Sequence, residues 1–154
     1  MRAAIAALVL ACAAAGCGGS EDAASEPLRD GVYEYEVSEQ YLLDNGIGQY
    51  QAEEESGVHT VTLDAGDFVD KWRTAQGKFG SCHGTFEPDG TRVTFRWTIG
   101  CWGDWEMRYQ VEGDTVTWSD VEALPPYDTE EDQKVNEVFN GVPWTRVGNA
   151  TKED

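Results

Sequence analysis

Residues 91–118 read TRVTFRWTIGCWGDWEMRYQVEGDTVTW, and this stretch decides the fold. Apolar and polar side chains alternate in TRVTFRWTI (91–99) and again in WEMRYQVE (105–112). Alternation with a period of two gives a strand one dry face and one wet face. The pairs Asp89-Gly90 and Gly113-Asp114 flank these segments and are typical of two-residue β-hairpin turns. The stretch therefore predicts an antiparallel β-meander.

More strands are expected on both sides of the meander, where short runs rich in Val, Thr, Tyr, Phe and Trp are broken by Gly, Asp and Asn. These runs are 32–37, 58–63, about 67–74, 81–87, 115–121 and 144–147. Two short helices interrupt them. One is N-capped by Ser38 and ends near Gly46, and the other starts at a capping-box-like Asp128 and Glu131 and ends before Pro143. The fold class is all-β: one domain over residues 29–148, whose meander closes into a barrel of about eight strands.

The N-terminus has the layout of a secretory signal peptide over residues 1–16. A single basic residue, Arg2, precedes an apolar run that is too short for the roughly 17–25 residues of a transmembrane helix. Ala14-Ala15-Gly16-Cys17 resembles the lipobox of bacterial lipoproteins, which implies cleavage before Cys17 and lipid on its sulfur. The alternative is an ordinary signal peptide with an incidental cysteine. Residues 17–28 are expected to be a flexible tether and residues 149–154 a disordered tail.

The composition excludes two classes of partner. The 154 residues carry 11 Lys and Arg against 29 Asp and Glu, for a net charge of −18. So acidic a surface repels nucleic acid and anionic lipid headgroups. Attachment to the membrane would therefore come from acyl chains on Cys17, and the expected location is extracytoplasmic, lipid-anchored to the cell membrane.

Cys12 leaves with the signal peptide and Cys17 would carry the lipid, so two cysteines remain, Cys82 and Cys101. A compartment outside the cytoplasm favours a disulfide between them over free thiols. A loop at Asp89-Gly90 would place Cys82 opposite Trp97 and Cys101 opposite Lys78, which is too far for a bridge. The bridge therefore requires a local departure from the regular strand ladder. Glycines that allow one are Gly80, Gly84, Gly100 and Gly103.

No motif predicts catalysis, a metal or a cofactor. His59 and His83 are the two histidines; each fits an ordinary strand position, and neither has the spacing of a metal site. No serine lies in a nucleophile elbow, and no glycine-rich phosphate loop occurs. The acidic clusters at 53–55 and 130–132 are interpreted as solvated surface.

Aromatic content is the feature that stands out, with 6 Trp, 6 Tyr and 5 Phe. On the expected strands these rings have two interpretations, a filled core or the wall of a ligand cavity, because a barrel of about eight strands can be filled or can hold one small ligand. The candidate ligand-binding residues are Tyr33, Tyr35, Phe95, Trp97, Trp105, Tyr109 and Trp118.

Four segments resemble lipocalin-like domains in secreted proteins of high-GC Gram-positive bacteria: DGVYEYEVSEQYLLDNG (30–46), DGTRVTFRW (89–97), VEGDTVTW (111–118) and VFNGVPWTRV (138–147). The resemblance implies a calycin-type antiparallel barrel whose interior binds a small, largely apolar molecule. It implies no catalytic residue, and one barrel fold serves many functions.

The leading functional hypothesis is a non-enzymatic, membrane-anchored lipoprotein that binds a small apolar or amphipathic ligand. The second is a cell-envelope module that docks another secreted protein through a sheet edge or its acidic face. The third is a hydrolase of unrecognised type. An enclosed apolar cavity would favour the first, a filled barrel with an exposed aromatic patch the second, and a convergent His and carboxylate pair in a cleft the third.

Overall fold

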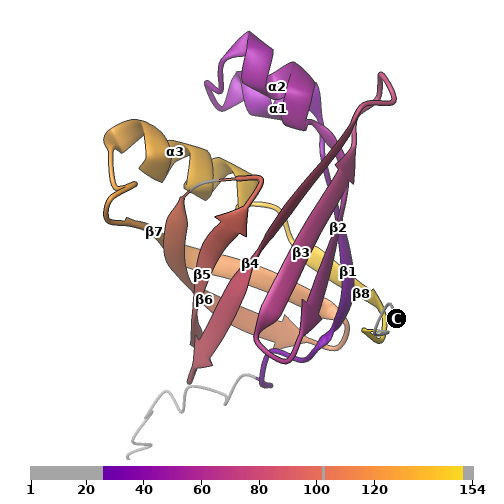
Figure 1. The fold of residues 1–154 in the computed structure, drawn as a ribbon, viewed down its shortest axis with the longest axis vertical. Helices are drawn as coiled ribbons and strands as arrows, with labels where there is room; N and C mark the ends of the chain where they lie inside the picture. The colour runs from indigo at the N-terminus through magenta and orange to yellow at the C-terminus, as the bar shows by residue number, and fades with distance from the viewer. Residues whose placement is uncertain (1–25, 102, 151–154) are drawn as a thin grey trace, which may run out of the picture.

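The computed structural model describes residues 26–101 and 103–150, and within them eight strands form a closed antiparallel barrel (Figure 1). This confirms the predicted all-β barrel. The predicted signal peptide, Cys17, most of the tether and the last four residues of the tail lie outside the described residues. In order around the barrel the strands are β1 (Gly31–Val37), β2 (Gly57–Asp64), β3 (Asp67–Arg73), β4 (Phe79–Asp89), β5 (Arg92–Ile99), β6 (Asp104–Glu112), β7 (Thr115–Leu124) and β8 (Trp144–Gly148).

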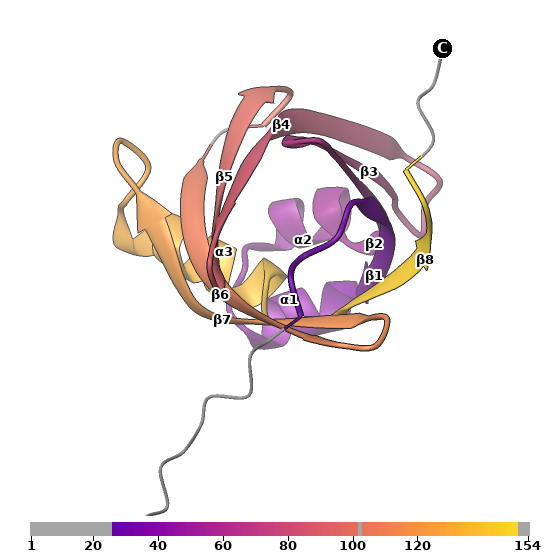
Figure 2. The same cartoon turned by 90° about the horizontal axis from the view of Figure 1, so that it is seen from below.

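The last strand closes the barrel. β8 pairs with β1, where Tyr33 lies opposite Arg146, and with β7, where Val116 lies opposite Trp144. Looking along the barrel, Figure 2 shows the strands as a ring with helices across its far end. Closure gives each of the eight strands a neighbour on both sides, although the β7–β8 ladder has only two residue pairs, Thr115 with Thr145 and Val116 with Trp144.

The hairpin between β4 and β5 differs from the predicted register. Asp89 pairs with Arg92, so the turn residues are Gly90 and Thr91 rather than Asp89 and Gly90, and Trp97 lies opposite Gly84 instead of Cys82. The shift of two residues leaves every side chain on its predicted face. A register irregularity between His83 and Gly84 then supplies the expected departure from the ladder.

That irregularity allows the predicted disulfide. Cys82 and Cys101 are bonded, with their Cα atoms 5.4 Å apart. Gly100, beside Cys101, has a φ of +88°, a conformation that L side chains rarely adopt. The glycine next to the bridge thus lets the chain turn back from β5 toward β4.

Three helices lie at one end of the barrel: α1 (Glu39–Asp44), α2 (Gln49–Glu55) and α3 (Glu130–Phe139) (Figure 1). α1 begins at the predicted N-cap, Ser38, whose side chain accepts from the Tyr41 N–H. α3 begins one residue later than predicted, with a capping box between Thr129 and Asp132. α2 was not predicted, because its sequence, QYQAEEE, buries only Ala52 and has no apolar period. No helix among the described residues is long and apolar enough to cross a membrane.

The core has two parts. The larger fills the barrel, and its members include Tyr33, Leu63, Phe86, Phe95, Met107, Tyr109 and Val116. The smaller lies beneath the helices and comprises Val37, Leu42, Ile47, Ala52 and Val138. At the end away from the helices, the Tyr33 hydroxyl donates to the Arg29 carbonyl at 2.6 Å and the Tyr109 hydroxyl to the Gly90 carbonyl at 2.7 Å. The end of the barrel away from the helices is therefore closed by packed side chains.

Candidate ligand-binding cavity

A cavity of about 660 Å³ lies between the barrel strands and helices α2 and α3. This volume falls within the roughly 300–1,000 Å³ of small-molecule sites. Two of its lining residues, Tyr50 on α2 and Phe79 at the start of β4, are 79% and 73% exposed, so the cavity opens to solvent beside them. Of its 25 lining residues ten are polar or charged and nine are aromatic: Tyr35, Tyr50, Phe68, Trp72, Phe79, Trp97, Trp105, Phe139 and Trp144.

One wall is a stack of four rings on neighbouring strands. Tyr35 lies between Trp144, at 5.3 Å, and His59, at 4.5 Å, and His59 stacks in turn on Trp72 at 5.6 Å. All three pairs are nearly parallel. The stack follows from register, because Tyr35 lies opposite His59 and His59 opposite Trp72 in the ladder. Directly opposed side chains on one face of a sheet are its closest neighbours.

Phe68, Trp97 and Trp105 form a second wall. The Phe68 and Trp97 ring centroids are 4.5 Å apart, and those of Trp97 and Trp105 are 5.2 Å apart. Two glycines of β4 make room for this arrangement. A Cβ on Gly80 would overlap the Trp72 ring and one on Gly84 would overlap the Phe68 ring, so both rings lie flush against the β4 backbone.

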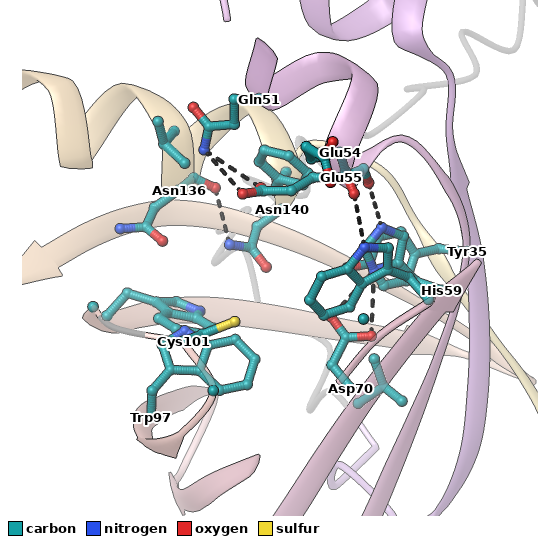
Figure 3. A pocket seen from close by; sticks show the side chains of 18 of the residues that line it. Tyr35, Gln51, Glu54, Glu55, His59, Asp70, Trp97, Cys101, Asn136 and Asn140 are labelled. Carbon is teal, nitrogen blue, oxygen red and sulfur yellow. Dashed lines mark hydrogen bonds and ion pairs between the residues drawn. The ribbon is translucent and has the colours of Figure 1, made fainter. Parts of the chain in front are cut away.

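A buried His–Asp pair lies beside the ring stack (Figure 3). His59 Nδ1 is 3.1 and 3.3 Å from the two Asp70 carboxylate oxygens, and His59 Nε2 is 2.9 Å from the Glu55 backbone carbonyl. Both ring nitrogens therefore face acceptors, and a neutral imidazole has only one N–H. A neutral imidazole can therefore donate to Asp70 or to the Glu55 carbonyl, and an imidazolium donates to both. Beside an ionised Asp70 the pair is neutral with an imidazolium and negative with a neutral ring, so it carries no net positive charge in either form.

Burial raises the pKa of two acidic groups in the lining, the Tyr35 hydroxyl and the Glu55 carboxyl. Burial, followed by the Asp70 and Glu55 carboxylates, raises the pKa of the Tyr35 hydroxyl well above its ordinary value, so Tyr35 stays protonated. Burial also raises the pKa of Glu55; Asp70 adds to this shift, while Gln51 and His59 oppose it. Glu55 is thus harder to ionise than a carboxyl in water.

Helix α2 is tied to the barrel by its C-terminal carbonyls. The Trp72 indole N–H donates to the Glu54 carbonyl at 3.0 Å, and His59 holds the Glu55 carbonyl. Lys78, just before β4, forms an ion pair with the Glu54 carboxylate. Trp72 and His59 thus satisfy carbonyls that a helix end leaves without intrahelical partners, and Lys78 holds the Glu54 side chain. They also fix the edge of the cavity that α2 supplies.

Three of the seven candidate ligand-binding residues, Tyr35, Trp97 and Trp105, line the cavity. The other four do not, and are buried in the barrel core or packed against it: Tyr33, Phe95, Tyr109 and Trp118. Sequence reasoning missed Asp70, Trp72 and Trp144 and gave His59 no binding role. A signal for Asp70 was available, because it alternates with Phe68 and Trp72 and so occupies the inner face of a strand, where a carboxylate requires a partner.

Three buried indole N–H groups, of Trp105, Trp118 and Trp144, have no hydrogen-bond acceptor among the described residues. Each belongs to a ring that meets another edge to face: Trp105 with Phe68 at 80°, Trp118 with Phe95 at 81°, and Trp144 with Trp118 at 70°. Aromatic edges are positive and faces negative, which partly compensates a buried N–H. The three nitrogens have almost no accessible surface, so they are not counted as donors to a ligand.

Within residues 26–101 and 103–150, no group of three or more His, Cys, Asp or Glu side chains is arranged to hold a metal ion. No protein-family model matches the chain, and neither does any curated protein or solved structure. The functional argument therefore depends on the geometry of the cavity.

Proposed function

We propose that this protein is a non-enzymatic binding protein of the lipocalin-like type, which holds a small, mainly apolar or amphipathic molecule in the cavity beneath α2 and α3. The aromatic cavity of about 660 Å³ carries the proposal. Ligand sites of this size are typically lined by apolar and aromatic side chains with a few polar groups that orient the ligand. Here the polar groups include the amides of Gln51, Asn136 and Asn140 and the Glu55 carboxyl.

The His59–Asp70 pair does not favour a hydrolase. A catalytic His needs one nitrogen free to take a proton from a nucleophile or water. His59 has both nitrogens engaged, and its side chain is only 4% exposed. No serine or cysteine thiol among the described residues bonds to it. The geometry suits a structural brace between β2, β3 and α2 better than an acid–base catalyst.

We further propose that lipid on Cys17 holds the protein at the outer face of the cell membrane. β1 starts at the end of the barrel opposite α1 and α2 (Figure 1), so a tether preceding it would leave from the packed end. The open end of the cavity would then face away from the membrane. This orientation suits capture of a ligand from the surrounding fluid.

Titration with the neutral fluorophore N-phenylnaphthylamine tests the binding function. We expect saturable binding with quenching of tryptophan fluorescence. Trp97→Ala should weaken binding by about tenfold, the equivalent of about 1.4 kcal/mol, because the probe loses one aromatic wall. Since Trp97 is only partly buried, the same change should destabilise the fold by less than the roughly 3–5 kcal/mol of a fully buried ring.

Phe86→Ala is the matched control, because Phe86 is 6% exposed and does not line the cavity. It should cost about 3–5 kcal/mol of stability and leave probe affinity nearly unchanged while the protein is folded. Non-saturable binding by the parent protein would contradict the proposal. Equal loss of affinity in both variants would mean that the probe does not occupy the cavity.

A further inference from the structure

Glu55 is a carboxylate that faces the cavity without a cation. It is the last residue of α2 and lines the cavity; Figure 3 shows its carboxylate turned toward Gln51 and the α3 side of the cavity, while its backbone carbonyl faces His59. Its hydrogen-bond donor is the Gln51 amide, at a long 3.4 Å from each oxygen. None of the ion pairs found within the described part of the chain includes Glu55.

The charged groups near Glu55 do not neutralise its carboxylate. Any positive charge on His59 is matched by the Asp70 carboxylate 3.1 Å from its Nδ1, so the pair supplies no net positive charge to Glu55. Lys78 is engaged by Glu54. The charged residues that α3 adds to the lining, Glu131 and Asp132, are both acidic. An ionised Glu55 thus leaves the cavity with an uncompensated negative charge.

The same cavity offers rings to an organic cation. Ammonium groups are attracted to the faces of Trp, Tyr and Phe within about 6 Å of the ring centroid. Trp97 and Trp105 line the cavity together with Phe139, on the α3 side. The net charge of −18 also raises the local concentration of cations and speeds their association.

We propose that the ligand of this cavity is an amphipathic organic cation, whose apolar body packs on the aromatic walls and whose ammonium group pairs with the Glu55 carboxylate. This inference rests on the proposed function, since it specifies the chemistry of the molecule that the cavity binds. The raised pKa of Glu55 is consistent with a site that lacks its counter-ion, because a bound cation would favour the ionised form.

Competition against bound N-phenylnaphthylamine tests the inference with three ten-carbon chains at monomeric concentrations: decyltrimethylammonium, decanol and decanoate. They share an apolar tail and differ in the charge of the head group. We expect the cation to displace the probe at least about tenfold better than the alcohol, and the alcohol better than the anion.

Glu55→Gln should reduce the preference for the cation over the alcohol to within about threefold. Glu53→Gln is the matched control, because Glu53 is on the same helix but exposed, where it accepts from Gln49. It should keep the full preference. A cooperative urea transition of the Glu55 variant shows that it is folded.

The outcomes separate the two proposals. If the parent protein does not bind the probe, the proposed function fails. If the probe binds but decanol competes as well as decyltrimethylammonium, the cation inference is wrong and the binding function stands. If the preference for the cation survives in Glu55→Gln, or is lost equally in Glu53→Gln, Glu55 is not the partner of the ammonium group and the inference is overturned.

Discussion

We expect Asp70→Ala to lower the free energy of unfolding by about 3 kcal/mol. Asp70 is 8% exposed and its carboxylate lies 3.1 Å from Nδ1 of His59, which is 3% exposed. Removing one partner of a buried charged pair costs about 3–5 kcal/mol, because the other is left without a counter-ion. The low end applies here, since a neutral His59 can still donate from Nε2 to the Glu55 carbonyl. Even so, about 3 kcal/mol is a large share of the roughly 5–15 kcal/mol that stabilises a typical domain.

Asp70→Asn is the informative control. Its amide can donate to Nδ1 of a neutral His59 while Nε2–H still donates to the Glu55 carbonyl, so every group keeps a partner. We expect this variant to cost under about 1 kcal/mol. Urea denaturation followed by tryptophan fluorescence measures both changes, provided that the slope with denaturant stays constant.

The same variants test whether the pair fixes α2. Because His59 holds the last carbonyl of that helix, Asp70→Ala should also speed amide hydrogen exchange in residues 49–55, and Asp70→Asn should not. An Asp70→Ala protein within about 0.5 kcal/mol of the parent would refute a stabilising role for the His59–Asp70 pair. Equal damage by alanine and asparagine would refute it as well.

Four more changes have defined outcomes. Gly80→Ala should displace the Trp72 ring, destabilise the fold by about 1–3 kcal/mol and weaken probe binding, as urea denaturation and titration would show. Deleting the chain from Pro143 onward removes β8 and exposes two strand edges, so it should give aggregates by size-exclusion chromatography, not a soluble, cooperatively melting domain. The Cys17→Ser protein should be released from membranes into the medium or accumulate as uncleaved precursor. Mature variant protein in the membrane fraction would contradict the lipid anchor. Since burial raises the pKa of Glu55, its ionisation costs stability above that pKa, and the cost vanishes as pH falls below the ordinary carboxyl range. Glu55→Gln should therefore raise the urea midpoint at neutral pH and lose this advantage in acid.

The sequence predicts where the strands lie better than it predicts which residues of neighbouring strands pair. Period-two alternation located two strands, β5 and β6, and runs rich in Val, Thr and aromatic residues located the other six. The β4–β5 register was wrong by two residues, since Asp89-Gly90 and Gly90-Thr91 are both plausible turns and the alternation is the same for either. Helix α2 could not be predicted, because the bonds that tie it to the barrel come from His59, Trp72 and Lys78, outside the helix itself.

The cavity was only partly predictable, because its lining depends on contacts between segments that are far apart in the sequence. Aromatic residues at strand positions indicated either a core or a cavity wall, and Tyr35 and Trp105 line the cavity whereas Phe95 and Tyr109 fill the barrel. Even Phe95 and Trp105, which lie directly opposite each other in the β5–β6 ladder, fall in different sets. Which rings line the cavity depends on the pairing of the strands and on where the helices lie, and neither can be read from residue types alone.

Native mass spectrometry of the protein purified from its own host tests the central claim most directly. If the cavity holds a small ligand, the native spectrum should contain a species heavier than the polypeptide, and the excess should vanish on denaturation. Lipid on Cys17 would remain, since it is covalent. A native mass equal to the denatured mass, together with no small molecule in the denatured extract, would contradict a ligand-binding role for the cavity.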